Sequence, residues 1–444
     1  MGTLRAGFGA AKITPGLDVS LAGYFEERLA TAVHDDLYAR ALVLDDGQAQ
    51  AGLLSCDLIG VSAAQVASIR NLVEAATELP AGSLLVCATH THTGPRNQAR
   101  EDTQGKNVTD EWIAAFPQRA AEAVIAAMAD REPCSISGAY ALEDRIAFNR
   151  RYRMKDGTVQ TNPGRVSPTG AMTSTAIAGG TPPRDSGLVQ STIRNPNIIE
   201  PAGPIDPEVG VLAFTGADGR TRAIYVNYSC HLDCVGGTEI SADYPGHMMR
   251  RLQDRVAGSP FVLFSNGAAG NVNHFDLRSP YHRQGHEHAR WMGETLAGDV
   301  CQALGGLAPL SGEPVRAASE VIQLPMREGA DRTAGRVEIQ AISVGDVGFV
   351  GIPAEYFVEF QLDIKKRSPF KHTFISSLAN GSVGYVPTRK AFEENIKDVP
   401  AESMKSFDQK GYEVRSALAR GFLPGVGEVM ADAAVWLLDQ LALA

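Results

Sequence analysis

The chain has 444 residues, of which 44% are hydrophobic and 21% are charged, the proportions of a folded globular protein. One hydrophobic core rarely supports this length, so we expect either two domains or one large domain with several layers. A net charge of -10 and the lack of any basic run exclude nucleic acid as a partner.

Sequence features also bear on location and redox state. No part of the chain holds an apolar stretch of about 18 residues, so we expect no stable membrane insertion. The sequence as it stands predicts a cytoplasmic protein, or a periplasmic or secreted one if a leader has been removed. Most of the six cysteines lie within apolar segments, and we expect them to be reduced core residues.

The first third of the chain alternates strand-like and helix-like segments. We expect strands at 50–59 and 83–88 and helices at 63–76 and 110–129. This β-α-β-α order favours a mainly parallel sheet covered by helices.

The remaining predicted elements are two hairpins, one short apolar strand and three helices. The hairpins join 209–215 to 222–228 and 337–344 to 347–352, the strand covers 260–265, and the helices cover 245–257, 285–304 and 425–441. The strand at 260–265 runs into the glycine-rich segment Asn266 to Gly270, which lets the main chain turn into a site.

Two stretches do not fit a compact core. Residues 165–204 are dominated by Ser, Thr, Gly and Pro, and we interpret them as an inserted loop. Such a loop is either mobile, or a lid over the site, or a contact with another subunit of a homo-oligomer. Residues 395–411 form a second, charged stretch of poor periodicity.

Two imidazoles, His90 and His92, directly follow the apolar segment 84–88. Strand exits of this kind are where α/β proteins place their chemistry. In an extended segment residues i and i+2 face the same side, so both rings are able to enter one pocket, one to hold a metal and the other to act on substrate. Taken alone, the pattern fits two hydrogen-bonded histidines in a polar loop equally well.

Two further candidates also follow predicted strands. His231 comes after the apolar segment 223–230, and Glu355 comes soon after the strand at 347–352. A lone histidine in this position is more often a satisfied core residue, and Glu355 is a ligand, an acid or base, or a helix cap. Zinc in catalytic sites takes three or four nitrogen or oxygen ligands, so three strand ends that each offer one favour a metal site.

Several motifs resemble those of one known family. The segment Ala88 to Pro95, A-T-H-T-H-T-G-P, looks like the A-T-H-T-H-S-G-P signature of the neutral, non-lysosomal ceramidases. Further blocks follow in the family's order, and the resemblance spans roughly residues 5 to 440, with the character of the family's bacterial branch. These blocks are Asn227 to His231, Ser241 to Gly246, Gly267 to Asn273, Ile352 to Glu355 and Gly384 to Thr388.

The resemblance implies an α/β fold, a multilayered sandwich of mixed β-sheets flanked by helices. Residues 1–444 would form a single catalytic domain without the C-terminal immunoglobulin-like domain of those enzymes. It also implies zinc held by His90, His231, Glu355 and Tyr385, with His92 next to the bound substrate. Asp243 and His274, which lie in or beside the matched blocks, join the expected substrate-binding residues.

The chain also departs from the family pattern. Asn273 stands where ceramidases carry the serine of G-D-V-S-P-N, which excludes a serine-dependent mechanism there. Guanidiniums at Arg150 and Arg151, which follow Asn149, favour a carboxylate or polyhydroxylated substrate over a lipid if they lie near the site. The alternative is a structural salt bridge.

The sequence therefore predicts a zinc-dependent hydrolase that cleaves an amide or similar carbonyl bond in a small polar molecule. We expect His92 to transfer a proton or stabilise an oxyanion, Asn273 to donate a hydrogen bond to the substrate carbonyl, and Tyr385 to ligate the metal or protonate the leaving group. Two other classes stay open: a metal-assisted lyase or carbohydrate-active enzyme, and a non-catalytic protein that binds a metal or ligand.

Overall fold

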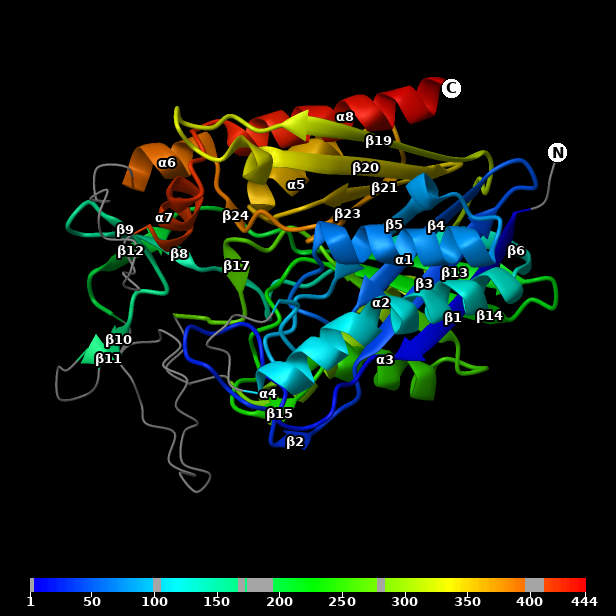
Figure 1. Cartoon of the computed structure of the whole chain (residues 1–444), viewed down its shortest axis with the longest axis horizontal. Coiled ribbons are helices and arrows are strands. Elements are labelled where there is room, and N and C mark those ends of the chain that lie inside the picture. The colour runs from blue at the N-terminus through cyan, green and yellow to red at the C-terminus, as the bar shows by residue number, and fades with distance from the viewer. Residues whose placement is uncertain (1–3, 99–104, 167–171, 174–194, 278–283, 396–410) are drawn as a thin grey trace.

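Two β-sheets lie face to face at the centre of the molecule, and helices cover their outer faces (Figure 1). The structure is a computed structural model that describes residues 4–98, 105–166, 172–173, 195–277, 284–395 and 411–444. This arrangement confirms the predicted α/β sandwich of mixed sheets flanked by helices.

The larger sheet has the strand order β16-β14-β13-β6-β1-β3-β4-β5, with β18 paired to β6. Only β4 with β5 and β14 with β16 are parallel pairs, and the other neighbours are antiparallel. Its strands are β1 (Arg5–Lys12), β3 (Tyr38–Asp45), β4 (Gln50–Cys56), β5 (Leu84–Ala88), β6 (Glu132–Leu142), β13 (Glu208–Gly216), β14 (Thr221–Tyr228), β16 (Phe261–Asn266) and β18 (Ala308–Leu310).

The expectation of a mainly parallel sheet is wrong. The β-α-β order of β4, α1 and β5 does give one parallel pair, but β1, β3 and β6 carry no clear strand pattern and run antiparallel to their neighbours. In β1 the small residue Gly7 is required because helix α2 packs directly on the strand: a Cβ there would come within 1.9 Å of the Ala127 carbonyl oxygen. Tertiary packing has overridden strand propensity at this position.

The smaller sheet has the order β19-β20-β21-β23, with β21 and β23 parallel. Its strands are β19 (Val315–Gln323), β20 (Arg336–Val344), β21 (Val347–Ile352) and β23 (His372–Ser377). Aromatic side chains fill the space between the two sheets, among them Tyr225 from the larger sheet and Phe349 and Phe374 from the smaller one.

Six helices cover the outer faces. The larger sheet is covered by α1 (Ala63–Ala76) and α2 (Lys106–Ala129), and by α3 (Asp243–Arg255) and α4 (His286–Leu304). The smaller sheet is covered by α5 (Val358–Arg367) and α8 (Val426–Leu443), and Figure 1 shows α8 running along β19 and β20. Two shorter helices, α6 (Arg389–Asn395) and α7 (Tyr412–Ala419), lie near the site described below.

Small strand pairs fix the loops at the strand exits. They join β2 (Ala32–Val33) to β15 (Glu239–Ile240), β7 (Phe148–Asn149) to β17 (Val272–Asn273), β22 (Glu355–Tyr356) to β24 (Tyr385–Val386), β10 (Arg165–Val166) to β11 (Met172–Thr173), and β8 (Arg151–Met154) to β9 (Val159–Thr161) and β12 (Ile198–Pro201). The pairing of β12 with β8 corrects one expectation: residues 198–201 are a strand, and Ile198 is buried with Tyr152 and Met154. Most of the predicted insertion, at 167–171 and 174–194, lies outside the described residues, as does 396–410 of the second stretch.

Within the described ranges, no helix combines the length and the apolar character needed to cross a bilayer. All six cysteines fall in these ranges, and all are free thiols, five of them buried. The expectation of reduced core cysteines is therefore confirmed.

Candidate metal centre

Two strand exits run side by side at the centre of the site. Thr91, after β5, forms a parallel bridge with Leu232, after β14, and the His92 amide donates to the Leu232 carbonyl at 3.1 Å. The segment His-Thr-His at 90–92 therefore lies beside His-Leu-Asp at 231–233. His90 Nε2 and His231 Nε2 lie 3.2 Å apart, and His92 faces Asp233.

The glycine-rich exit of β16 joins these two segments. The Asn266 side-chain amide donates to the Thr89 carbonyl at 3.1 Å, and the His231 amide donates to the Val272 carbonyl at 3.1 Å. His90 itself has a φ of 81°, a left-handed conformation that is costly for a residue with a side chain. The surrounding hydrogen bonds hold it there and turn its ring toward His231.

Glu355 reaches the same point from the smaller sheet. It lies opposite Tyr385 in the β22–β24 pair, and its Oε2 is 3.4 Å from Nε2 of both His90 and His231. The Gly270 amide donates to the Tyr356 carbonyl at 2.8 Å, which seats the glycine-rich loop directly against the Glu355 backbone.

The hydrogen bonds of these groups leave a set of atoms that fits a cation. Nδ1 of His90 and Nδ1 of His231 each lie 2.7 Å from a backbone carbonyl, those of Ile59 and Ala269, so each ring carries its proton on Nδ1 and presents a lone pair at Nε2. Burial lowers the pKa of His231 to about 4, which keeps that ring neutral near pH 7. Glu355 Oε2 is buried without a hydrogen-bond donor. Two facing lone pairs and a carboxylate oxygen without a donor form a set of ligands suited to a positive ion.

The spacing of these atoms fits a small tetrahedral ion. Two ligands about 2.0–2.1 Å from zinc in a tetrahedral site are about 3.3–3.4 Å apart. The three separations among His90, His231 and Glu355 are 3.2, 3.4 and 3.4 Å. The ligand nitrogens of His90, His92 and His231 also all lie within 4.8 Å of one another. A buried cluster able to hold a metal is thus present, and His92 belongs to it through an Nε2 that lies 3.3 Å from His90 Nε2.

A cavity of about 170 Å³ opens beside this cluster, and its wall combines charged side chains with aromatic rings. His92 and Asp233 line it together with Tyr24, whose hydroxyl donates to Asp233 Oδ1 at 2.5 Å. His92 Nδ1 lies 3.6 Å from the same Oδ1 and has no hydrogen-bond partner. Burial raises the pKa of Asp233 to about 6 and holds the pKa of His92 well below its ordinary value.

The opposite wall of this cavity carries Arg150, Tyr385 and Tyr412. Arg150 Nε donates to Glu413 Oε1 at 2.9 Å, and its Nη1 lies 3.4 Å from His231 Nε2, while its buried Nη2 has no partner. The Arg150 guanidinium lies over the Tyr385 ring, 5.2 Å from its centroid, and burial raises the pKa of Tyr385 well above the ordinary value for a phenol, although Arg150 opposes this rise. The phenol is therefore protonated near neutral pH in the metal-free protein.

The structure brings together six of the residues singled out in the sequence, namely His90, His92, Arg150, His231, Glu355 and Tyr385. Asn149, Arg151, Asp243, Asn273 and His274 do not line this cavity. Asn273 lies one layer behind it, where its amide donates to Asn162 at 3.1 Å and its Oδ1 accepts from the Phe275 amide. Arg151 forms a salt bridge with Glu394, which is the alternative role that the sequence left open for this residue. The Asn149 side-chain amide donates to the Pro204 carbonyl.

Asp243 and His274 are also set back from the cavity. Asp243 Oδ2 accepts from the amides of Cys234 and Val235, each at 2.9 Å, which fixes the turn that follows Asp233. Burial raises the Asp243 pKa to about 7 in spite of these bonds. His274 packs its ring on Phe275. The contacts of both residues are those of a scaffold for the loops around the site.

Asp233, Tyr24 and Glu413 are the members of the site that sequence reasoning missed. Asp233 repeats the i, i+2 spacing of His90 and His92, so the same argument applied to His231 would have found it. No local pattern marks Tyr24 or Glu413, which reach the site from an N-terminal loop and from α7.

Comparison with solved structures identifies the fold. The crystal structure of neutral ceramidase from Pseudomonas aeruginosa matches 99% of this chain and 75% of its own length, with a TM-score of 0.71 and 17% sequence identity. A ceramidase complexed with C2 matches 100% of this chain and 76% of its own length, with a TM-score of 0.72 and 16% identity. No protein-family model and no curated protein sequence matches the chain. The resemblance to neutral ceramidases is therefore confirmed at the level of the fold.

Proposed function

We propose that this protein is a zinc-dependent hydrolase that cleaves an amide or related carbonyl bond in a small polar molecule. The observation that carries the proposal is the convergence of two Nε2 lone pairs and the unsatisfied Oε2 of Glu355 at tetrahedral spacing. The ceramidase fold of the two structural neighbours supports amide chemistry, because a ceramidase hydrolyses the amide bond of ceramide.

His90, His231 and Glu355 would hold the metal. A bound zinc ion supplies Lewis acidity, which polarises a substrate carbonyl and lowers the pKa of a water molecule toward neutrality. In the overall reaction the oxygen of water adds to the carbonyl carbon and the C–N bond breaks, so an acid and an amine are released. No serine nucleophile is required, consistent with asparagine at position 273.

The polar residues of the cavity have separate tasks in this reaction. The unpartnered Nη2 of Arg150 is placed to bind the oxygen on which negative charge develops. His92 takes a proton from the attacking water, and Asp233, held by Tyr24, keeps the ring in place. Tyr385, which is protonated and lies opposite Glu355 in the β22–β24 pair, returns a proton to the leaving nitrogen. Asn273 acts through Asn162 rather than on the substrate.

The small volume of the cavity and the charged side chains in its wall support a small polar substrate. We expect poor turnover of long-chain ceramide, because a space of about 170 Å³ that holds the charged side chains of Arg150 and Asp233 is too small for a long acyl chain. Ceramide turnover equal to that of a true ceramidase would contradict this expectation.

Elemental analysis combined with a substrate screen tests the proposal. The screen compares N-acyl amino acids, lactams, N-acyl sugars and short ceramides, using wild type, His231→Ala and the matched control His372→Ala, a buried histidine of β23 outside the site. We expect zinc and amide hydrolysis in wild type and control, and neither in His231→Ala. A product with a new double bond, seen as ultraviolet absorbance, would instead indicate a lyase, and zinc without turnover of any compound would indicate a binding protein.

A further inference from the structure

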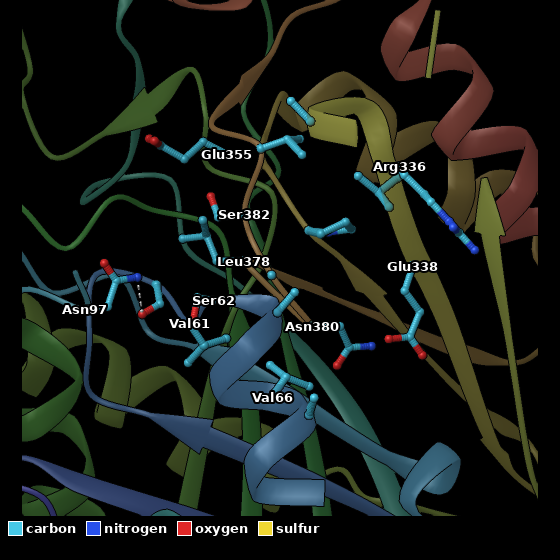
Figure 2. Close-up of a pocket in the computed structure, with 18 of the residues that line it drawn as sticks. Val61, Ser62, Val66, Asn97, Arg336, Glu338, Glu355, Leu378, Asn380 and Ser382 are labelled. Atoms are coloured by element: carbon cyan, nitrogen blue, oxygen red, sulfur yellow. Dashed lines mark hydrogen bonds between the residues drawn. The ribbon is translucent and has the colours of Figure 1, made fainter. Parts of the chain in front are cut away.

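A second, larger cavity lies against the other side of the metal-capable cluster. It has a volume of about 690 Å³ and shares Ile59, His90 and Glu355 with the smaller cavity. In Figure 2, Glu355 lies on one side of this space, Arg336 and Glu338 lie on the opposite side, and Val66 of α1 lies along the bottom. A substrate bound at the cluster therefore has room to extend in this direction.

The charged residues of this cavity leave an excess of positive charge. Arg70 is neutralised, since its Nη1 contacts both carboxylate oxygens of Glu338 at 3.1 and 2.8 Å. Arg336 and Arg420 also line the cavity, both are exposed, and neither has an ion pair within the part of the chain that the structure describes. In a chain with a net charge of -10, two unpaired guanidiniums in one cavity are an unusual local concentration of positive charge.

Arg420 lies at the junction of this cavity with the site. Its guanidinium lies against Gly384, the residue before Tyr385, so that a Cβ at Gly384 would come within 2.9 Å of Arg420 Nε. The Gly384 carbonyl in turn accepts from the Glu355 amide at 2.9 Å. Between the cluster and the two arginines the wall includes the apolar residues Val61, Leu378 and Val383.

We propose that this cavity binds the part of the substrate beyond the scissile carbonyl, and that this part ends in a carboxylate recognised by Arg336 and Arg420. The inference rests on the proposed function. The substrate class is then an amide whose acyl or amine portion has a short apolar chain and a terminal carboxylate. Guanidinium groups suit this role because they bind a carboxylate through paired, charge-assisted hydrogen bonds.

Calorimetric titration with the dicarboxylates succinate, glutarate and adipate tests the cavity without any need for turnover. The neutral diamides of the same acids are the comparison ligands. We expect zinc-loaded wild type to bind at least one dicarboxylate more tightly than its diamide, with an affinity that falls as salt is added. The double variant Arg336→Gln with Arg420→Gln should lose roughly tenfold or more of the dicarboxylate affinity, since each exposed pair is worth up to roughly fivefold.

The matched control is Arg290→Gln, which removes one exposed cation on α4 outside the cavity and should leave binding unchanged. Equal binding of dicarboxylate and diamide by wild type, or an unchanged affinity in the double variant, would overturn the inference.

An activity comparison separates this inference from the proposed function. If amides are hydrolysed but the double variant prefers acidic over neutral amides as strongly as wild type does, the inference fails and the proposed function stands. If no amide is hydrolysed while the arginine-dependent binding of dicarboxylates persists, the proposed function fails and the anion-binding cavity stands. We expect the double variant to lose roughly tenfold in kcat/KM for acidic amides and nothing for neutral ones, through a higher KM at unchanged kcat.

Discussion

Replacement of Gly270 by alanine tests whether Glu355 is a metal ligand without touching any candidate ligand. A Cβ at Gly270 would lie 2.4 Å from the Glu355 carbonyl oxygen and 2.9 Å from the Tyr356 carbonyl oxygen. To restore a separation of 3.0 Å, the Glu355 backbone or the glycine-rich loop must move by at least about 0.6 Å, and cores resist such shifts. The substitution therefore displaces Glu355 from His90 and His231.

The size of this displacement decides the expected effect. Metal sites hold their ligand distances to within about 0.2 Å, so a shift of about 0.6 Å weakens coordination by Glu355. We expect zinc affinity to fall roughly 10- to 100-fold, the usual effect of disturbing the support of a metal ligand. Overpacking should also reduce the free energy of unfolding of the metal-free protein by about 1–3 kcal/mol.

Zinc affinity is measured by competition with a chromophoric chelator, and stability by thermal unfolding in excess EDTA. The matched control is Gly298→Ala on α4, where a Cβ would meet nothing within 4 Å. Because alanine is the better helix former, the control should raise stability by about 0.5–1 kcal/mol and leave zinc affinity unchanged. A Gly270→Ala protein that binds zinc as tightly as wild type would refute the assignment of Glu355 and favour the cluster of His90, His92 and His231. If this variant does not fold, Glu355→Gln decides the same question by the same titration.

Further predictions concern the individual residues of the site. His90→Ala and His231→Ala should each lose about one zinc per chain in elemental analysis, and unchanged metal in both would contradict the site. Tyr385→Phe should keep zinc and lose kcat, whereas loss of zinc would show that Tyr385 is a ligand. Asp233→Asn should lower kcat roughly 10- to 100-fold and shift its pH profile at unchanged zinc content, and a normal kcat would remove Asp233 from the mechanism. In metal-free protein the pKa of His231 is lowered to about 4, so between pH 6.5 and 4 the unfolded chain binds more protons than the folded one. The free energy of unfolding should therefore fall by roughly 3 kcal/mol as the pH drops through this window. In denaturant titrations at several pH values, His231→Gln should make the free energy of unfolding less dependent on pH.

Elements with a strong local pattern could be predicted from the sequence. The helix expected at 63–76 has those bounds, because Ser62 and Gln65 form a reciprocal capping box at its start and polar residues define its outer face. The hairpin of β13 and β14 was equally clear from two apolar runs around a turn at Asp218 and Gly219. In such segments local propensity and tertiary packing agree, so sequence suffices.

Long-range register could not be predicted in the same way. The sequence indicates that functional residues follow β5, β14 and β21. It does not indicate that β5 lies at the edge of the larger sheet, β14 in the opposite half of that sheet, and β21 in the smaller sheet. Their meeting depends on pairings between residues far apart in the chain, such as Thr91 with Leu232 and Glu355 with Tyr385. Only the family resemblance placed Tyr385 in the site.

The fate of the arginines shows why residue type alone does not assign a role. Arg150 and Arg151 are adjacent and both buried, yet their contacts differ: Arg150, between β7 and β8, reaches the cavity beside His231, while Arg151, the first residue of β8, pairs with Glu394. One member of the pair is free to meet a substrate because Glu413 satisfies only its Nε and leaves Nη2 unpartnered. The structural interpretation of this basic segment therefore holds for Arg151, while a substrate-binding role for Arg150 stays a prediction. Arg70 and Arg336 in the larger cavity differ in the same way, because Glu338 neutralises Arg70 and leaves Arg336 without an ion pair, as the proposed carboxylate site requires.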